Sequence, residues 1–165
     1  MKKPEQPKTN AARQLDGLGI AYELRAYDVD EDDLSATTVA TRVGLPAEQV
    51  YKTLCLRGQS GACYFALIAA DRELDPKAMA RAVGEKSIEP VAVKELVGLT
   101  GYIRGGVTAL SPKKAFPVVV DELMPLHERV SVSAGQRGLQ ILLDPADYIR
   151  AVAASVAVIS RDSAS

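Results

Sequence analysis

Two adjacent β-rich runs in the middle of this chain constrain its fold most strongly. Residues 50–57 (VYKTLCLR) and 63–70 (CYFALIAA) are dominated by apolar, aromatic and β-branched side chains, and only the short segment Gly-Gln-Ser-Gly at 58–61 divides them. Two such runs joined by a short glycine-containing loop predict a β-hairpin. Any fold for this chain therefore has to contain this hairpin.

Strand and helix patterns alternate irregularly on both sides of the hairpin. Alternating or β-rich patterns predict strands at 20–26, 118–121, 129–133, 139–142 and 155–160. Capping residues, proline positions and terminal glycines predict helices at 10–18, 35–44, 75–83, 90–97 and 144–151, and a first helical turn at 46–48. This order is too irregular for a doubly wound sheet. It favours an α+β fold, with a mixed, barrel-like β-sheet surrounded by helices.

Length and composition indicate one globular domain. The chain has 165 residues, of which 47% are hydrophobic and 25% charged, with a formal net charge of −1. We expect a polar, proline-containing tail at residues 1–9 and a single domain over residues 10–165. No apolar run approaches the ~18 residues of a membrane helix, and the charged N-terminus is not followed by the apolar segment of a secretory signal. The expected location is the cytoplasm.

The few cysteines and histidines make a metal enzyme an unfavourable interpretation. Cys55 and Cys63 lie in the two hairpin runs without a CxxC spacing, which favours small buried apolar side chains. His127 is the one histidine, and its surroundings are typical of a surface turn rather than a catalytic site. We therefore expect no metal and no cofactor.

Charge is distributed unevenly although its sum is near zero. Residues 27–50 contain six acids and one arginine, a local charge of −5, whereas residues 101–120 contain three cations and no acid, a local charge of +3. One face could thus attract an anionic partner while the whole protein does not. Ordinary solvated surface charge explains the same pattern equally well.

Lys52 is the strongest candidate functional residue. It lies in the first hairpin run, and alternation places it on the same face as Val50, Leu54 and Leu56. An ammonium group on an apolar face must pair, extend to the rim or bind an anionic or polar ligand. A lysine at the strand edge that points to water remains the alternative.

Two glycine clusters are further candidates. Gly105-Gly106 and the pair Gly135 and Gly138 could expose backbone N–H groups to a phosphate or a carbonyl oxygen. Arg137, inside the second cluster, could contact a phosphate or simply face solvent. Neither cluster matches a P-loop or a dinucleotide-binding motif, so ordinary turns remain the alternative.

Three segments of the chain resemble one known family. They are GLPAEQVYKTL at 44–54, TGYIRGG at 100–106 and VSAGQRGL at 132–139. Their order and spacing are similar to those of the bacterial Cys-tRNA(Pro) deacylase family, YbaK/EbsC, which is related to the editing domain inserted in bacterial prolyl-tRNA synthetases. The resemblance extends over residues 12–162.

This resemblance implies a function and a set of site residues. The family binds the 3′ end of an aminoacylated tRNA and cleaves the ester of a wrong amino acid, here expected to be cysteine on tRNA(Pro), or on tRNA(Cys). Lys52 matches the family's lysine and would act as an electrostatic anchor, while the thiol of the substrate attacks its own carbonyl. The other implied pocket residues are Tyr27, Thr53, Gly105, Gly106, Ser133, Gly135 and Arg137. Prolyl-tRNA synthetase is the implied protein partner.

The chain also departs from the family pattern. Ala109 stands where a proline is frequent, Gln140 where an aspartate is frequent, and Ala134 replaces a glycine of the second cluster. Two other interpretations therefore stay open: a sibling deacylase for alanine or another small amino acid, and a module that binds a tRNA end or nucleotide without turnover.

Overall fold

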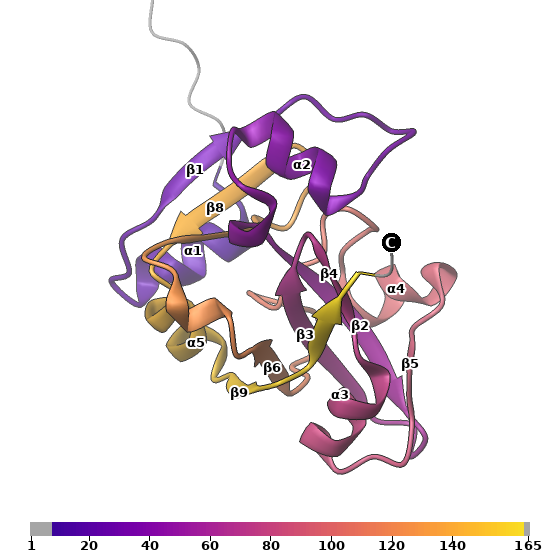
Figure 1. Ribbon diagram of the computed structural model, residues 1–165. Helices are drawn as coiled ribbons and strands as arrows, with labels where there is room; N and C mark the ends of the chain where they lie inside the picture. Colours follow the sequence, from indigo (N-terminus) through magenta and orange to yellow (C-terminus); the bar gives the residue numbers. More distant parts are fainter. Residues whose placement is uncertain (1–7, 164–165) are drawn as a thin grey trace, which may run out of the picture.

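The hairpin expected from the sequence forms the centre of the protein, whose computed structural model describes residues 8–163 (Figure 1). Strand β2 (Tyr51–Gly58) pairs antiparallel with β3 (Cys63–Ala69), with Tyr51 opposite Ala69 and Arg57 opposite Cys63. Every residue of β3 is buried, because both faces of the sheet are covered. This explains why β3 is a continuous apolar run rather than an alternating one.

Five strands form the largest sheet, in the order β5-β2-β3-β6-β9. The short β5 (Ile88–Pro90) pairs antiparallel with only the last three residues of β2. On the other side, β6 (Val118–Asp121) and β9 (Ser155–Ala157) continue the sheet in parallel. Most of the outer edge of β2 therefore has no strand beside it.

A second sheet is antiparallel and faces the first. It consists of β1 (Glu23–Ala26), β8 (Leu139–Leu143) and β7 (Val130–Ser133), in the order β1-β8-β7. A single parallel bridge, between Val50 and Ser131, joins the two sheets. The expected barrel-like α+β fold is confirmed, although one bridge does not close a barrel. A third ladder pairs β4 (Arg72–Leu74) with β10 (Ser160–Asp162).

Within residues 8–163 five helices cover these sheets, and three of them have the side-chain caps expected from the sequence. The five helices are α1 (Asn10–Gly17), α2 (Ala36–Val43), α3 (Pro76–Val83), α4 (Val93–Thr100) and α5 (Pro145–Val152), with 3-10 turns at Ala47–Gln49 and Met124–Leu126. The side chains of Ser35, Asp75 and Asp144 cap α2, α3 and α5, as their sequences indicate. Among the described residues no helix is long and apolar enough to cross a bilayer.

Some expected boundaries were wrong for identifiable reasons. The helix expected at 90–97 begins only at Val93, because Pro90 ends β5 opposite Leu56. The strand expected at 155–160 is two strands, since the N–H groups of Ile159 and Ser160 donate to the buried Asp121 carboxylate instead of to a neighbouring strand.

Smaller corrections concern the N-terminal region. Thr9, not Asn10, caps α1, because the Thr9 hydroxyl accepts the N–H of Ala12. The strand expected at 20–26 pairs only over β1, where Glu23 lies opposite Leu142 and Ala26 opposite Leu139 of β8. Of the tail expected at 1–9, residues 1–7 lie outside the described part of the chain.

Three apolar clusters hold the elements together. The largest lies between the two main sheets and includes Leu15 of α1, Phe65 of β3, Ile141 of β8 and Tyr148 of α5. The second lies on the opposite face of the large sheet, where Met79 of α3 packs. The third places α2 against the start of β2. Together they put β2 at the junction of all three clusters.

Candidate functional site

A cavity of about 440 Å³ runs along the outer edge of β2. Its walls come from β2, the start of α2, the segment before and within α4, the loop at 104–107 and the ends of β7 and β8. From Val50 to Leu56 a strand advances roughly 20 Å, so the cavity is an elongated groove. One end is apolar, near Val91 and Leu96, and the other is polar, near Ser133 and Gln140.

The strand edge that lines this groove lacks a neighbouring strand over its middle. Pairing with β5 begins only at Leu56, and the bridge to Ser131 involves Val50. Between them, the Val91 N–H donates to the Cys55 carbonyl. By antiparallel alternation, the backbone N–H and C=O of Thr53 point toward the groove rather than toward β3. These are polar groups that a bound ester or amine can use.

Lys52 lies halfway along the groove and is half-buried. Burial lowers the pKa of its ammonium group, and the nearby carboxylates of Asp71 and Glu73 oppose that effect. No carboxylate of residues 8–163 forms an ion pair with it. A desolvated ammonium without an ion pair is well suited to bind an anionic or polar ligand.

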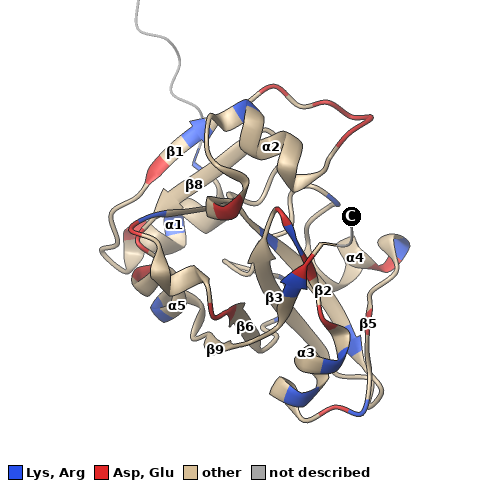
Figure 2. Cartoon of the chain, in the orientation of Figure 1, with Lys and Arg blue, Asp and Glu red and all other residues tan. Residues whose placement is uncertain are grey.

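The groove is otherwise cationic or neutral. Arg104 is the second cation on its wall, and none of the described residues that line it is Asp or Glu. The acidic residues expected in a local cluster instead lie on the loop that follows β1, visible as the red segments above α2 (Figure 2). The site therefore favours an anionic or polar ligand over a cation.

Two polar side chains face the groove from the second sheet. Ser133 of β7 is directly opposite Gln140 of β8, and both line the cavity. The Ser133 hydroxyl accepts the N–H of Gly135 at 3.1 Å, and the Ser131 hydroxyl donates to Oε1 of Gln140 at 2.7 Å. Both side chains are thus held in place by neighbours on their own sheet.

The two glycine clusters pack against each other. A Cβ atom on Gly106 would lie 3.0 Å from the Gln136 Cα and 3.1 Å from the Arg137 nitrogen, so only glycine permits this approach. The Gly106 N–H donates to the Ile103 carbonyl, which occupies the donor that the sequence offered to a ligand. Gly105 has φ +87° and lines the groove.

The structure brings together four of the eight residues predicted for the site. These four, which line the groove, are Lys52, Thr53, Gly105 and Ser133, whereas Tyr27, Gly106, Gly135 and Arg137 do not line it. Tyr27 lines a small adjoining cavity of about 10 Å³. Arg137 donates to the Arg104 carbonyl at 2.7 Å and lies 3.4 Å from a Glu31 oxygen. Its guanidinium group therefore connects the loop that contains Arg104 with the loop that follows β1.

Sequence reasoning missed the apolar wall and the helix at the rim. The groove is also lined by the start of α2 (Ser35, Ala36, Thr37 and Val39) and by Val91, Val93, Leu96 and Val107. Val93 is largely exposed although apolar, and it begins a helix that was expected to start at residue 90. An exposed valine beside buried ones is compatible with a binding surface, but this exposure is visible only in the structure and the sequence carries no signal for it.

The described residues give little support for a cysteine nucleophile or a metal site in this protein. Cys55 lines the groove, but burial raises the pKa of its thiol to about 11, so it is a poor nucleophile near neutral pH. His127 packs edge-on against Tyr51, with ring centroids 6.0 Å apart, and is not among the residues that line the groove. Within residues 8–163 no group of three or more potential metal ligands occurs.

Comparison with solved structures defines the class of fold. The protein superimposes on a crystal structure of the hypothetical protein APE2540 with a TM-score of 0.83 and 22% identity, covering 92% of this chain and 99% of the other. A candidate trans-editing enzyme for prolyl-tRNA synthetase matches with a TM-score of 0.80 and 22% identity, covering 94% and 99% of the two chains. The chain therefore has the α+β fold that these two solved structures share.

Sequence comparison identifies the family. The family model of the aminoacyl-tRNA editing domain matches residues 30–151. A relative from Enterococcus faecalis, named as a candidate Cys-tRNA(Pro)/Cys-tRNA(Cys) deacylase, EbsC, is 39% identical over 144 residues, covering 87% of this chain and 88% of the relative. The chain belongs to the aminoacyl-tRNA editing domain family, which confirms the resemblance stated from its motifs.

Proposed function

We propose that this protein is a trans-editing deacylase that releases cysteine from mischarged tRNA, with Cys-tRNA(Pro) as its main substrate and Cys-tRNA(Cys) as a second one. The name of the Enterococcus faecalis relative supports this substrate. The structural observation that carries the proposal is Lys52, a half-buried ammonium without an ion pair in a groove whose described lining has no carboxylate.

The groove can hold both halves of an aminoacyl ester. Lys52 and Arg104 are placed to bind the phosphate and ribose oxygens of the terminal nucleotide and to stabilise negative charge on the ester carbonyl. The free backbone groups of Thr53 can accept from the α-amino group and donate to an oxygen of the substrate. Thr53 thus contributes through its backbone.

The substrate itself supplies the nucleophile. The sulfur of the cysteinyl group attacks its own carbonyl carbon, a C–S bond forms, and the bond from that carbon to the ribose oxygen breaks. The ribose oxygen gains the proton that the thiol lost, so the products are free tRNA and a cysteine thiolactone, which water then opens. Intramolecular attack is favoured by effective molarities on the order of 10⁵ M when the reacting atoms are held in position.

The tRNA body is recognised weakly by this chain alone. Its net charge is −1, and the three cations of residues 101–120, Arg104, Lys113 and Lys114, would supply only a few phosphate contacts. Each such contact releases a counterion and makes affinity depend on salt. We therefore infer that selection of tRNA(Pro) depends on a partner, and the solved structure of the trans-editing protein directs this inference to prolyl-tRNA synthetase.

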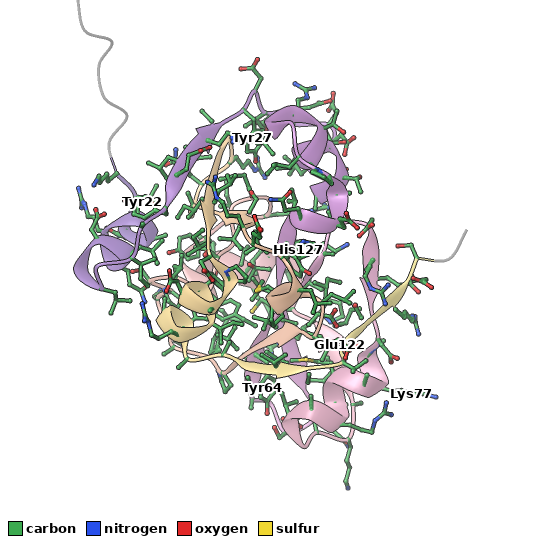
Figure 3. The ribbon with its side chains drawn as sticks, turned by 60° about the vertical axis from the view of Figure 1, so that its left-hand side comes forward. Tyr22, Tyr27, Tyr64, Lys77, Glu122 and His127 are labelled. Carbon is green, nitrogen blue, oxygen red and sulfur yellow. The ribbon has the colours of Figure 1, made fainter. Side chains whose placement is uncertain are left out.

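The decisive test is deacylation of Cys-tRNA(Pro) and Ala-tRNA(Pro) by the wild type, Lys52→Ala and Lys77→Ala. Lys77 is a matched control, because it extends from α3 into solvent (Figure 3). We expect cysteine release by the wild type and by the control, and loss of at least a hundredfold in Lys52→Ala. Release of alanine alone would make the protein a sibling deacylase, and release of neither by a folded wild type would overturn the proposal.

A further inference from the structure

Gln140 is an almost fully enclosed polar side chain in the wall of the groove. Only 5% of it is exposed, and it lies on β8, across the groove from β2. Its Oε1 accepts from the buried Ser131 hydroxyl at 2.7 Å, and its Nε2 has no hydrogen-bond partner among residues 8–163. Two N–H donors are therefore available to a molecule in the groove.

The position of Gln140 is fixed relative to Lys52. Ser131, which holds the carboxamide, forms the bridge to Val50, two residues before Lys52 on β2. Nε2 is not among the fully enclosed side-chain atoms that lack a partner in residues 8–163, so it is reached from the groove, where water or a ligand can accept from it. The carboxamide thus forms a preset donor opposite the cation that anchors the ester.

We propose that Gln140 is a specificity-determining residue, whose Nε2 donates a hydrogen bond to the sulfur atom on the side chain of the bound aminoacyl group. This inference rests on the proposed function and assigns the part of the groove that distinguishes cysteine from alanine. A carboxylate at this position would attract the α-ammonium group, whereas a neutral donor cannot. An ammonium has no lone pair to accept from Nε2, but sulfur has.

The same contact favours the reactive form of the substrate. A donor that faces a thiolate stabilises the charged form and lowers the pKa of the thiol, and hydrogen bonds to charged groups are stronger than neutral ones. Gln140 would therefore position the sulfur and increase the fraction that is ionised. Loss of the donor should weaken binding of cysteine and shift the pH dependence of its release.

Binding can be tested with stable probes that do not depend on turnover. Two amide-linked aminoacyl adenosines, 3′-cysteinylamino- and 3′-alanylamino-3′-deoxyadenosine, differ only in the sulfur atom. We expect the wild type to bind the cysteinyl probe about tenfold more tightly, in keeping with one hydrogen bond. Gln140→Met should remove this preference, whereas Gln59→Met, in the exposed hairpin turn, should keep it.

A second variant protects the test against misfolding. Gln140→Glu retains an acceptor for Ser131 but replaces the donors by a negative charge, so it should also lose the preference. In both variants the acidic limb of the pH–rate profile with Cys-tRNA(Pro) should move to higher pH. An unchanged preference in folded variants, or equal loss for both probes, would overturn the role of Gln140. Failure of the wild type to bind either probe would count against the proposed function instead.

Discussion

Strand β2 and the glycine-rich loop at 104–107 both border the groove, and the second glycine-rich loop, at 134–138, packs behind the first. The strand and the loops contribute to the site in different ways. On β2, the ammonium group of Lys52 has neither an ion pair nor a hydrogen bond within residues 8–163, and burial lowers its pKa. In the loops, Gly106 and Arg137 use their polar groups on other parts of the protein. The strand therefore offers a ligand an ammonium group that has no partner in the described part of the protein, whereas these polar groups of the loops already have hydrogen-bond partners within it.

This difference shows that an internally unsatisfied group is a better guide to function than a conspicuous motif. The glycine clusters attract attention in the sequence because glycine permits close backbone approach. In the structure that approach is between the two loops themselves, where the Gly106 position faces the backbone of Gln136. Lysine on a strand is common, but a lysine left half-buried without a partner is not.

The sharpest test of the comparison replaces Lys52 by methionine. Methionine keeps most of the apolar stem and removes the charge, so we expect deacylation to fall at least a hundredfold while the melting temperature stays level or rises. The sign follows from the lowered pKa, because burial disfavours the charged form in the folded state. Kinetics and thermal unfolding on one preparation measure both effects. A clear fall in melting temperature would mean that Lys52 is structural.

Gly106→Ala tests the packing of the loops. In contrast to Lys52→Met, we expect its main effect to be on stability. The new Cβ would lie 3.0–3.1 Å from the backbone of the neighbouring loop, which cannot yield as a flexible side chain does. We expect destabilisation of roughly 1–3 kcal/mol. Gly98→Ala is the control, since Gly98 lies within α4 with nothing within 4 Å, and it should stabilise by up to about 1 kcal/mol. Denaturant unfolding distinguishes the two, and equal effects would refute the packing argument.

The smallest expected effect is the pH dependence of stability in alkaline solution. Burial raises the pKa of the Cys55 thiol to about 11, and it raises the pKa values of the Tyr51 and Tyr148 hydroxyls as well. As pH rises above about 9, these groups ionise in the unfolded chain first, so the folded state binds more protons. The free energy of unfolding should then fall, by up to about 1.4 kcal/mol per pH unit for each group.

Lys52 acts in the opposite direction, because its pKa is lowered in the folded state. Lys52 therefore reduces the fall in the free energy of unfolding that the thiol and the two hydroxyls cause. Urea unfolding at pH 8, 9 and 10 measures it, and Cys55→Ala should reduce it. A stability that stays constant or rises over this range would contradict the burial of these hydroxyl and thiol groups.

Local signals made most of the fold predictable from the sequence. The hairpin of β2 and β3, the capped helices at Ser35, Asp75 and Asp144, and the α+β class all follow from patterns within a few residues. The division between β9 and β10 does not, because it depends on the carboxylate of Asp121, 38 residues before Ile159. Tertiary hydrogen bonds of this kind leave no trace in local periodicity.

The candidate site was predictable only where one residue violates its local pattern. Lys52 interrupts an apolar face and was identifiable for that reason. Val91 and Leu96 conform to apolar patterns, so nothing in the sequence separates a groove wall from a core. Gln140 was identifiable only as a departure from the family pattern. The Nε2 group of Gln140 faces the groove because the Ser131 hydroxyl donates to Oε1 of the same side chain. That hydrogen bond exists only because β7 pairs with β8.

The unpaired edge of β2 also bears on how the protein avoids self-association. An exposed strand edge with free N–H and C=O groups is a template for pairing with another chain, which is a route to aggregation. Here the free edge lies at the base of a groove, bounded by β5 at one end and by the bridge to Ser131 at the other. A small ester can reach it, but a second strand would be blocked by α2 and α4 at the rim. The recess that admits a ligand thus also protects the protein from edge-to-edge aggregation.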